Sequence, residues 1–273
     1  MPIDNQETPL RWNQFHSCPL CEGTEVNLLR SDNCITHPLW QDGLLTQMQW
    51  MHCKSCEHVY SRDYLNTEGL TLLFKRANPE QLGGIDLDRE RFRWAPTVDR
   101  VQRHMPLAPW LSDDAVWLDV GCGSGGLVIT AAEYGFAAIG VDARQQAVDR
   151  LAEMGYSAVL GDLLSLNVSA PVAVLSLADV LEHVPYPRQA LQRAHSAIQE
   201  SGLLVVSCPN LDSGSWRQNT ALGNNPYWSE IEHCHNFSRS SLMRLLAQER
   251  FIPLEYSIST RYKSCMEIVA RRT

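Results

Sequence analysis

The stretch Trp117-Leu118-Asp119-Val120-Gly121-Cys122-Gly123-Ser124-Gly125-Gly126 decides the fold of this chain. An apolar run that ends in glycines and continues into a helical pattern is typical of the strand, tight loop and helix of a nucleotide-binding sheet. Gly121, Gly123 and Gly126 match the G-x-G-x-x-G pattern that holds a pyrophosphate. Gly121, Gly123 and Gly125 also form G-x-G-x-G behind an acidic residue, which suits a different nucleoside cofactor.

From Ala115 onward, apolar runs alternate with helical stretches, which predicts parallel strands joined by crossover helices. The last two predicted strands are too close for a helix between them and should form a hairpin. We therefore expect an α/β fold with a seven-stranded, mostly parallel, Rossmann-like sheet and an antiparallel C-terminal hairpin. The predicted strands are Ala115–Val120, Ala137–Val141, Ser157–Leu160, Val172–Leu177, Gly202–Ser207, Pro253–Ile258 and Cys265–Ala270, and the predicted helices are Gly126–Tyr134, Arg144–Met154, Arg188–Gln199 and Arg239–Arg250.

Composition divides the chain into three zones. Residues 1–60 hold five of the nine cysteines and four of the nine histidines with little helical or strand periodicity, which predicts a small ligand-stapled module. Residues 61–112 should form a helical linker or cap, with helices in Tyr64–Arg76 and Leu87–His104 separated by the breaker Asn78-Pro79 and by Gly83-Gly84. Residues 113–273 form the sheet domain, in which Leu163–Pro171 is expected to be a loop and Leu211–Pro226 a mobile lid or substrate loop.

Two C-x-x-C pairs, Cys18-Pro19-Leu20-Cys21 and Cys53-Lys54-Ser55-Cys56, predict a zinc-ribbon-like site of four thiolates. Four thiolates leave zinc no open position, so its role should be structural. The 31 residues between the pairs are more than a compact ribbon usually has. Two separate redox motifs are the alternative, and Cys34, His16, His52 and His58 are reserve ligands.

Bulk properties exclude some partners. The formal charge of −8 makes nucleic acid an unlikely partner, although a local basic patch remains compatible with it. The N-terminus has no basic segment followed by an apolar run, and no stretch approaches 18 uninterrupted apolar residues, so we expect no membrane partner and a cytoplasmic location.

Acidic residues follow the next predicted strands, where a nucleoside cofactor would lie. Asp142 follows the second strand, 23 residues beyond Asp119, and is placed to accept from ribose hydroxyls, while Asp162 follows the third and could accept from an adenine amino group. The fourth strand is followed by Ala178-Asp179-Val180-Leu181-Glu182-His183-Val184-Pro185. Together with L-D-V-G-C-G-S-G, G-V-D and G-D, this run resembles the class I S-adenosylmethionine-dependent methyltransferases, in particular the broad small-molecule group, over about residues 115–270.

The resemblance implies a cofactor whose chemistry fits the acids. S-adenosylmethionine offers a sulfonium cation and an amino-acid tail, so a carboxylate beside the glycine loop helps where it would repel a pyrophosphate. Asp119 is then expected to support the methionine moiety, and Cys122 to be a small packing residue rather than a nucleophile. The implied cofactor-binding residues are Asp119, Gly121, Cys122, Gly123, Gly125, Asp142, Ala143, Asp162, Leu163 and Asp179.

The candidate catalytic residues are Glu182, His183 and His235. Methyl transfer to a hydroxyl requires a base near the acceptor, and Glu182 and His183 lie just past the fourth strand. The second segment, Tyr227 to Ser238, resembles the H-x-F-S wall of the acceptor pocket in sugar- and quinone-type methyltransferases. His183 could instead only order a loop, His233 and His235 could be buried and hydrogen-bonded, and the segment could also bind a metal.

We expect methyl transfer to a hydroxyl of a small molecule such as a sugar or related metabolite. Zinc modules before such a core occur in deoxysugar C-methyltransferases, which carry a further C-terminal domain, and in certain ribosomal-RNA guanine methyltransferases. The alternatives are therefore an RNA-base methyltransferase that contacts RNA through its zinc module, and a non-catalytic protein that keeps the fold and binds a protein partner.

Overall fold

The computed structural model describes residues 11–82, 86–106, 115–166, 168–262 and 264–273. Its main sheet has seven strands in the order β12-β13-β10-β9-β6-β7-β8, and it confirms the expected fold class. Strands β10, β9, β6, β7 and β8 run parallel, whereas β13 is antiparallel to both β10 and β12. The bounds are β6 Val116–Val120, β7 Ala137–Asp142, β8 Ser157–Leu160, β9 Val172–Ala178, β10 Ile198–Pro209, β12 Phe251–Ile258 and β13 Cys265–Arg272.

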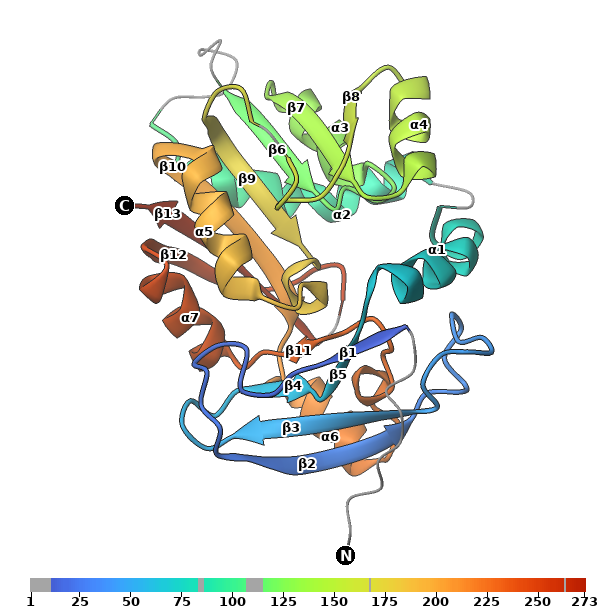
Figure 1. Cartoon of the computed structure of the whole chain (residues 1–273). Coiled ribbons are helices and arrows are strands. Elements are labelled where there is room, and N and C mark those ends of the chain that lie inside the picture. The colour runs from blue at the N-terminus through green and yellow to red at the C-terminus, as the bar shows by residue number, and fades with distance from the viewer. Residues whose placement is uncertain (1–10, 83–85, 107–114, 167, 263) are drawn as a thin grey trace, which may run out of the picture.

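Helices cover both faces of the sheet (Figure 1). On one face α5 (Pro187–Ala197) and α7 (Arg239–Gln248) share a core with Leu118 and Leu175, and on the other α2 (Leu87–Arg103) and α3 (Gly126–Glu133) share a core with Trp117 and Val174. Neighbouring residues of one strand thus enter opposite cores, as the two-residue period of a strand requires. The helix α4 (Gln145–Glu153) packs beside β7 and β8.

The helix α1 (Thr67–Leu82) begins later and ends later than the expected helix Tyr64–Arg76. The residues before it form β5 (Asp63–Leu65), which pairs with β1 (Trp12–Gln14). The expected break at Asn78-Pro79 is wrong, because α1 continues to Leu82. The expected break at Gly83-Gly84 lies outside the described residues.

The N-terminal segment is richer in strands than its sequence pattern indicates. A four-stranded sheet has the order β11-β4-β3-β2, with β2 Val26–Asn33, β3 Gln47–Cys53, β4 Val59–Ser61 and β11 His235–Asn236. β2 is an edge strand with exposed residues on both faces, so it lacks the alternation that predicts a strand. β11 comes from the C-terminal part of the chain and pairs His235 with Tyr60. This pairing joins the sheet to the segment from Tyr227 to Ser238.

The segment Leu211–Pro226 is not the open loop that its composition suggests. It contains α6 (Gly214–Ala221), and η3 (Pro226–Trp228) follows. Ser213 caps α6 by accepting from the Trp216 amide, and Asn225 caps η3. Serine and asparagine therefore mark helix starts here rather than flexibility. Leu163–Pro171 has no helix or strand among its described residues, as expected.

Candidate active site

The glycine loop between β6 and α3 depends on left-handed backbone angles. Gly121 and Gly125 have φ of 75° and 84°. A Cβ on Gly121 would lie 2.5 Å from Val180 Cγ2, and one on Gly125 would lie 2.5 Å from Leu151 Cδ1. The loop therefore excludes larger residues by both conformation and space.

The amides of this loop point into the protein. Gly121 and Cys122 donate to the Val141 carbonyl at 2.7 and 3.0 Å, Gly123 donates to Asp142 Oδ2 at 2.9 Å, and Gly125 donates to the Cys122 carbonyl at 2.8 Å. A pyrophosphate loop instead turns its amides toward the ligand. The geometry thus disfavours a phosphate ligand at these four amides.

The side chains of Asp119 and Cys122 are buried beside the loop. Ser176 donates to Asp119 Oδ1 at 2.5 Å, and Trp117 donates to the Ser176 hydroxyl at 2.9 Å. Burial raises the pKa of Asp119 to about 7. Cys122 packs with Val128 and other apolar residues, and burial raises the pKa of its thiol, as a packing role requires.

The carboxylate of Asp142, at the end of β7, accepts several hydrogen bonds. Besides the Gly123 amide, its carboxylate accepts from the Arg144 amide at 2.9 Å and from the Arg144 guanidinium at 3.0 and 3.1 Å. Arg144 also lies over the Phe74 ring of α1, 5.9 Å from its centroid. Ala143 and these neighbours open onto a cavity of about 410 Å³ between α1 and α4, lined by Thr71, Phe74, Lys75, Ala143, Arg144 and Gln146.

Asp162 follows β8 and is exposed. Its Oδ1 accepts from the amides of Leu164 and Ser165, both at 2.8 Å, and so closes a local turn. Leu163 is buried in the core next to that turn.

Asp179 follows β9 in a left-handed conformation with φ of 59°. It accepts from the Ser207 hydroxyl at 2.7 Å and from Arg261 at 3.3 Å. The guanidinium of Arg261 lies 3.8 Å from the centroid of the Trp94 ring. The Trp94 Nε1 donor is buried without a partner among the described residues and lies against Gly126, at the start of α3. The sequence analysis singled out neither Trp94 nor Arg261.

A second group of neighbouring side chains consists of Glu182, His183, Tyr227 and His233, and we name it the acceptor chamber after the role proposed for it below. Ligand atoms of Glu182, His183 and His233 all lie within 4.8 Å of one another. His183 and His233 are edge to face, with centroids 4.6 Å apart, and Tyr227 is stacked on His233 at 6.1 Å. Glu182 Oε2 and His233 Nδ1 are buried without partners among the described residues.

Burial favours the neutral forms of two members of this group. It raises the pKa of the Glu182 carboxyl well above its ordinary value and lowers the pKa of His233 to about 3. His183 is only partly buried, and its Nδ1 lies 3.1 Å from the Glu232 carbonyl. If Nδ1 donates that bond, Nε2 of the neutral ring is an acceptor.

His235 is bound on both sides of its ring. Nδ1 lies 3.0 Å from His58 Nε2, and Nε2 lies 2.9 Å from the Val184 carbonyl. It is fully buried, so this geometry suits a structural position rather than that of a base. The geometry agrees with the alternative that His235 is buried and hydrogen-bonded. The structure also separates it from the possible metal cluster, which joins His233 to Glu182 and His183.

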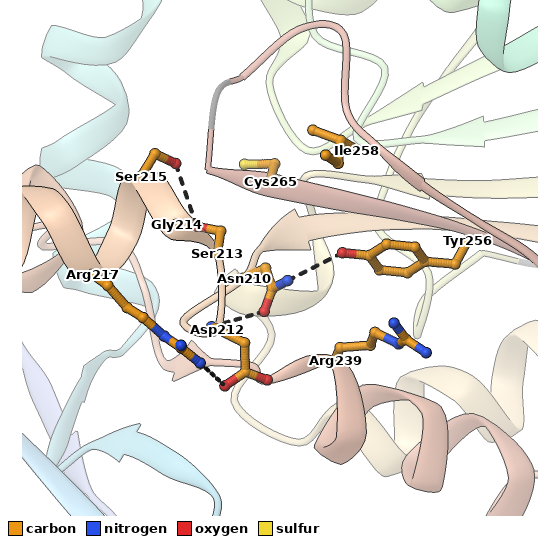
Figure 2. A pocket seen from close by; sticks show the side chains of 10 residues that line it. All are labelled: Asn210, Asp212, Ser213, Gly214, Ser215, Arg217, Arg239, Tyr256, Ile258 and Cys265. Atoms are coloured by element: carbon orange, nitrogen blue, oxygen red, sulfur yellow. Dashed lines mark hydrogen bonds and ion pairs between the residues drawn. The ribbon is translucent and has the colours of Figure 1, made fainter.

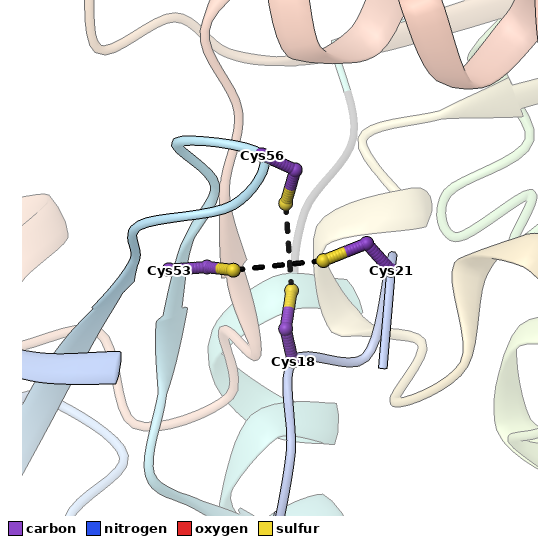
Figure 3. A group of neighbouring side chains, drawn as sticks. All are labelled: Cys18, Cys21, Cys53 and Cys56. Atoms are coloured by element: carbon purple, nitrogen blue, oxygen red, sulfur yellow. Dashed lines mark hydrogen bonds between the residues drawn. The ribbon is translucent and has the colours of Figure 1, made fainter. Parts of the chain in front are cut away.

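The four cysteines of the two C-x-x-C pairs converge on one point (Figure 3). Cys18 Sγ and Cys56 Sγ are 3.6 Å apart, and Cys21 Sγ and Cys53 Sγ are 3.5 Å apart. A tetrahedral site with Zn–S bonds of about 2.3 Å has edges of about 3.8 Å, so the thiols fit a zinc ion. Glu22 and Glu57, which follow the pairs, have φ of 59° and 60° and donate to the first cysteine's carbonyl in each pair.

Three further polar and aromatic side chains have partners in the fold. Asn210 donates to the Tyr256 hydroxyl at 3.2 Å, and Trp216 is stacked on Tyr227 at 5.1 Å. Trp228 is buried against Trp50.

Two proteins with the same name are similar to part of this chain in sequence. The chain is 31% identical over 107 residues to the ubiquinone biosynthesis O-methyltransferase of Idiomarina loihiensis, covering 36% of this chain and 44% of that protein. It is 27% identical over 150 residues to the protein of the same name from Glaesserella parasuis, covering 49% of this chain and 64% of that protein. The chain thus spans less than two thirds of the length of either relative.

Solved structures share the fold. The magnesium protoporphyrin IX methyltransferase of Synechocystis, with bound S-adenosylhomocysteine, is 18% identical with a TM-score of 0.54, over 76% of this chain and 96% of that one. The 1,6-didemethyltoxoflavin-N1-methyltransferase of Burkholderia thailandensis is also 18% identical, with a TM-score of 0.54, over 81% of this chain and 98% of that one. A family model described as a methyltransferase domain matches residues 88–251, more than half of the chain. The chain therefore belongs to the methyltransferase domain family.

Proposed function

We propose that the protein transfers a methyl group from S-adenosylmethionine to a hydroxyl of a small molecule such as a sugar or related metabolite. One observation supports the cofactor: the glycine loop has inward-facing amides, and an acid lies at or just beyond the end of each of four neighbouring parallel strands. These acids are Asp119, Asp142, Asp162 and Asp179. Such a site suits a sulfonium cation and repels a pyrophosphate. The O-methyltransferase names of the relatives support an oxygen acceptor.

Within this proposal, the methionine tail lies between the glycine loop and the pair Trp94 and Arg261. The buried Trp94 N–H without a partner and the start of α3 both favour the tail's carboxylate. Arg261 holds Asp179 beside them. The ribose would bind Asp142, which requires Arg144 to turn aside, and the adenine would enter the 410 Å³ cavity beside Phe74.

His183 is our proposed general base. Its partly exposed ring belongs to the acceptor chamber, and an Nε2 acceptor could take the acceptor's proton. Glu182 supports the site as a buried carboxyl with a raised pKa, which favours the protonated form. S-adenosylmethionine supplies the electrophilic methyl group when it is bound, and the chamber holds the acceptor oxygen and shields it from water.

We also propose a structural zinc ion bound by Cys18, Cys21, Cys53 and Cys56. Reduced thiols of this kind suit a cytoplasmic location. β4 follows the second cysteine pair and pairs with β11, which comes directly after His233 and Cys234. The zinc site would therefore support one wall of the active site.

Transfer of a labelled methyl group from S-adenosylmethionine tests the proposal. The protein is incubated with panels of sugars, phenols and other small hydroxyl compounds, and separately with RNA. Label in a small-molecule hydroxyl is expected. Label only in RNA would support an RNA-base methyltransferase instead, and no transfer to any acceptor would support a non-catalytic role.

A further inference from the structure

A cavity of about 670 Å³ opens at the ends of β10 and β12 and the start of β13 (Figure 2). The first residues of α6 and α7 complete it. Its lining contains none of the residues of the glycine loop or the acceptor chamber, and its volume is typical of small-molecule sites. The lining residues are Asn210, Asp212, Ser213, Gly214, Ser215, Arg217, Arg239, Tyr256, Ile258 and Cys265.

Positive charge exceeds negative charge in this cavity. It contains Arg217 and Arg239 against one acid, Asp212, in a chain whose formal charge is −8. Arg217 and Asp212 are 3.9 Å apart, and the Arg217 side chain is exposed, so this ion pair is weak. Arg239 lies over the Tyr256 ring at 4.9 Å and has no ion-pair partner among the described carboxylates.

Neutral donors add to this charge. Tyr256 accepts from Asn210 Nδ2 at 3.2 Å, which leaves its own hydroxyl proton to donate elsewhere. Gly214 is the first residue of α6, where an amide has no intrahelical partner. A Cβ on Gly214 would meet nothing within 4 Å, so this helix start faces open space. Arginine, hydroxyl and amide donors around one space favour an oxyanion.

The cavity adjoins the acceptor chamber. Cys265 lines the cavity, and its Sγ lies 3.7 Å from the Tyr227 hydroxyl. Tyr227 in turn is stacked on His233 of the chamber. Tyr227 thus connects the lining of the cavity to the chamber, and we expect one extended ligand to contact both.

We propose that this cavity binds the anionic group, a phosphate or a carboxylate, of the methyl acceptor. The inference rests on the proposed methyl transfer and narrows its substrate class to acidic small molecules. Arg239 is the main binding residue, because it lies over the Tyr256 ring and no described carboxylate forms an ion pair with it. Arg217 adds a second positive charge at the mouth.

Binding of inorganic phosphate and of acetate to the whole protein tests the site itself. Amide shifts in NMR spectra are recorded for the unchanged protein, for Arg239→Gln and for the control Arg89→Gln, which removes the same charge from an exposed position of α2. Saturable shifts at Gly214 and Arg239 are expected, with at least tenfold weaker binding only in Arg239→Gln. Equal binding in both variants, or no binding, would overturn the site.

Kinetics test the link to methylation. Pairs of acceptors that differ only by a phosphate or carboxylate are compared, and the expected result is a lower KM for the charged member. Arg239→Gln should raise that KM at least tenfold with little change in kcat, while Arg89→Gln changes neither. A KM that is equal for the charged and uncharged acceptors and unchanged in Arg239→Gln contradicts the inference. Methyl transfer to the uncharged member of each pair, measured in parallel, separates this result from failure of the proposed function, in which neither member is methylated in any form.

Discussion

At the scale of single residues, two histidines that were both candidate catalytic residues have different positions. His183 is partly exposed in the acceptor chamber, whereas His235 is buried between His58 and a carbonyl. The first suits proton transfer and the second suits support of the fold. The difference arises from contacts between residues 177 positions apart, which no local motif reveals.

His183→Asn should therefore lower kcat by about 10²- to 10⁴-fold, the usual contribution of a general base. Its melting temperature should change little, because the side chain is not fully buried. His235→Asn should mainly lower stability, since it leaves buried groups unpaired. Steady-state kinetics and thermal unfolding of both variants check this, and equal kcat losses at unchanged stability would contradict the assignment.

Asp119 gives the protein a distinctive pH dependence. Its pKa rises from an ordinary 3.8 to about 7 through burial, so the folded form holds a proton that the unfolded chain releases. Its contribution to stability should fall as pH rises from about 4 to 7, by about 1 kcal/mol per pH unit. Asp119→Asn should flatten this slope in urea unfolding measured across that window. An unchanged slope would show that Asp119 titrates normally.

At the scale of elements, the strand β6, the glycine loop and α3 form one unit. Gly121 has φ of 75° and faces Val180 of the loop after β9. Gly121 therefore sets how closely the glycine loop and the loop after β9 approach each other.

Gly121→Ala should destabilise the protein by about 1–2 kcal/mol through backbone strain and should weaken S-adenosylmethionine binding. Gly155→Ala is the matched control, because Gly155 also has positive φ, at 87°, but a Cβ there meets nothing within 4 Å. Both changes should cost stability, and only the first should cost cofactor affinity in calorimetry. Equal affinity in the two variants would argue against a cofactor role for the loop.

Elements were predictable where pattern and packing agree. The seven strands of the main sheet are apolar runs between turns, and their bounds match the predictions to within a few residues. β2 was missed because its exposed edge has no alternation, and α6 because its capping residues are also loop residues. The acids after the strands were predictable, but Arg261 was not, because the hairpin brings it to Asp179 from 82 positions away.

At the scale of the whole molecule, the cysteine module and the sheet domain meet at the acceptor chamber. β11 pairs with β4, and His37 contacts Glu230 across 193 positions of sequence. None of the described helices is long and apolar enough to cross a membrane.

Removal of zinc should therefore affect acceptor use before cofactor binding. Chelation, or Cys53→Ser, should lower the metal content from about one equivalent and destabilise the module. We expect the acceptor KM to rise several-fold while S-adenosylmethionine affinity changes less, because the cofactor loops belong to the main sheet. Metal analysis with parallel kinetics checks this, and a protein that never contains zinc would refute the site.

The glycine loop is proposed to bind a methyl donor and not a dinucleotide. Isothermal calorimetry of the unchanged protein with S-adenosylmethionine, and separately with NAD, distinguishes the two ligands. Saturable binding of S-adenosylmethionine at one site per chain and no binding of NAD are expected. Binding of NAD without binding of S-adenosylmethionine would contradict the proposal.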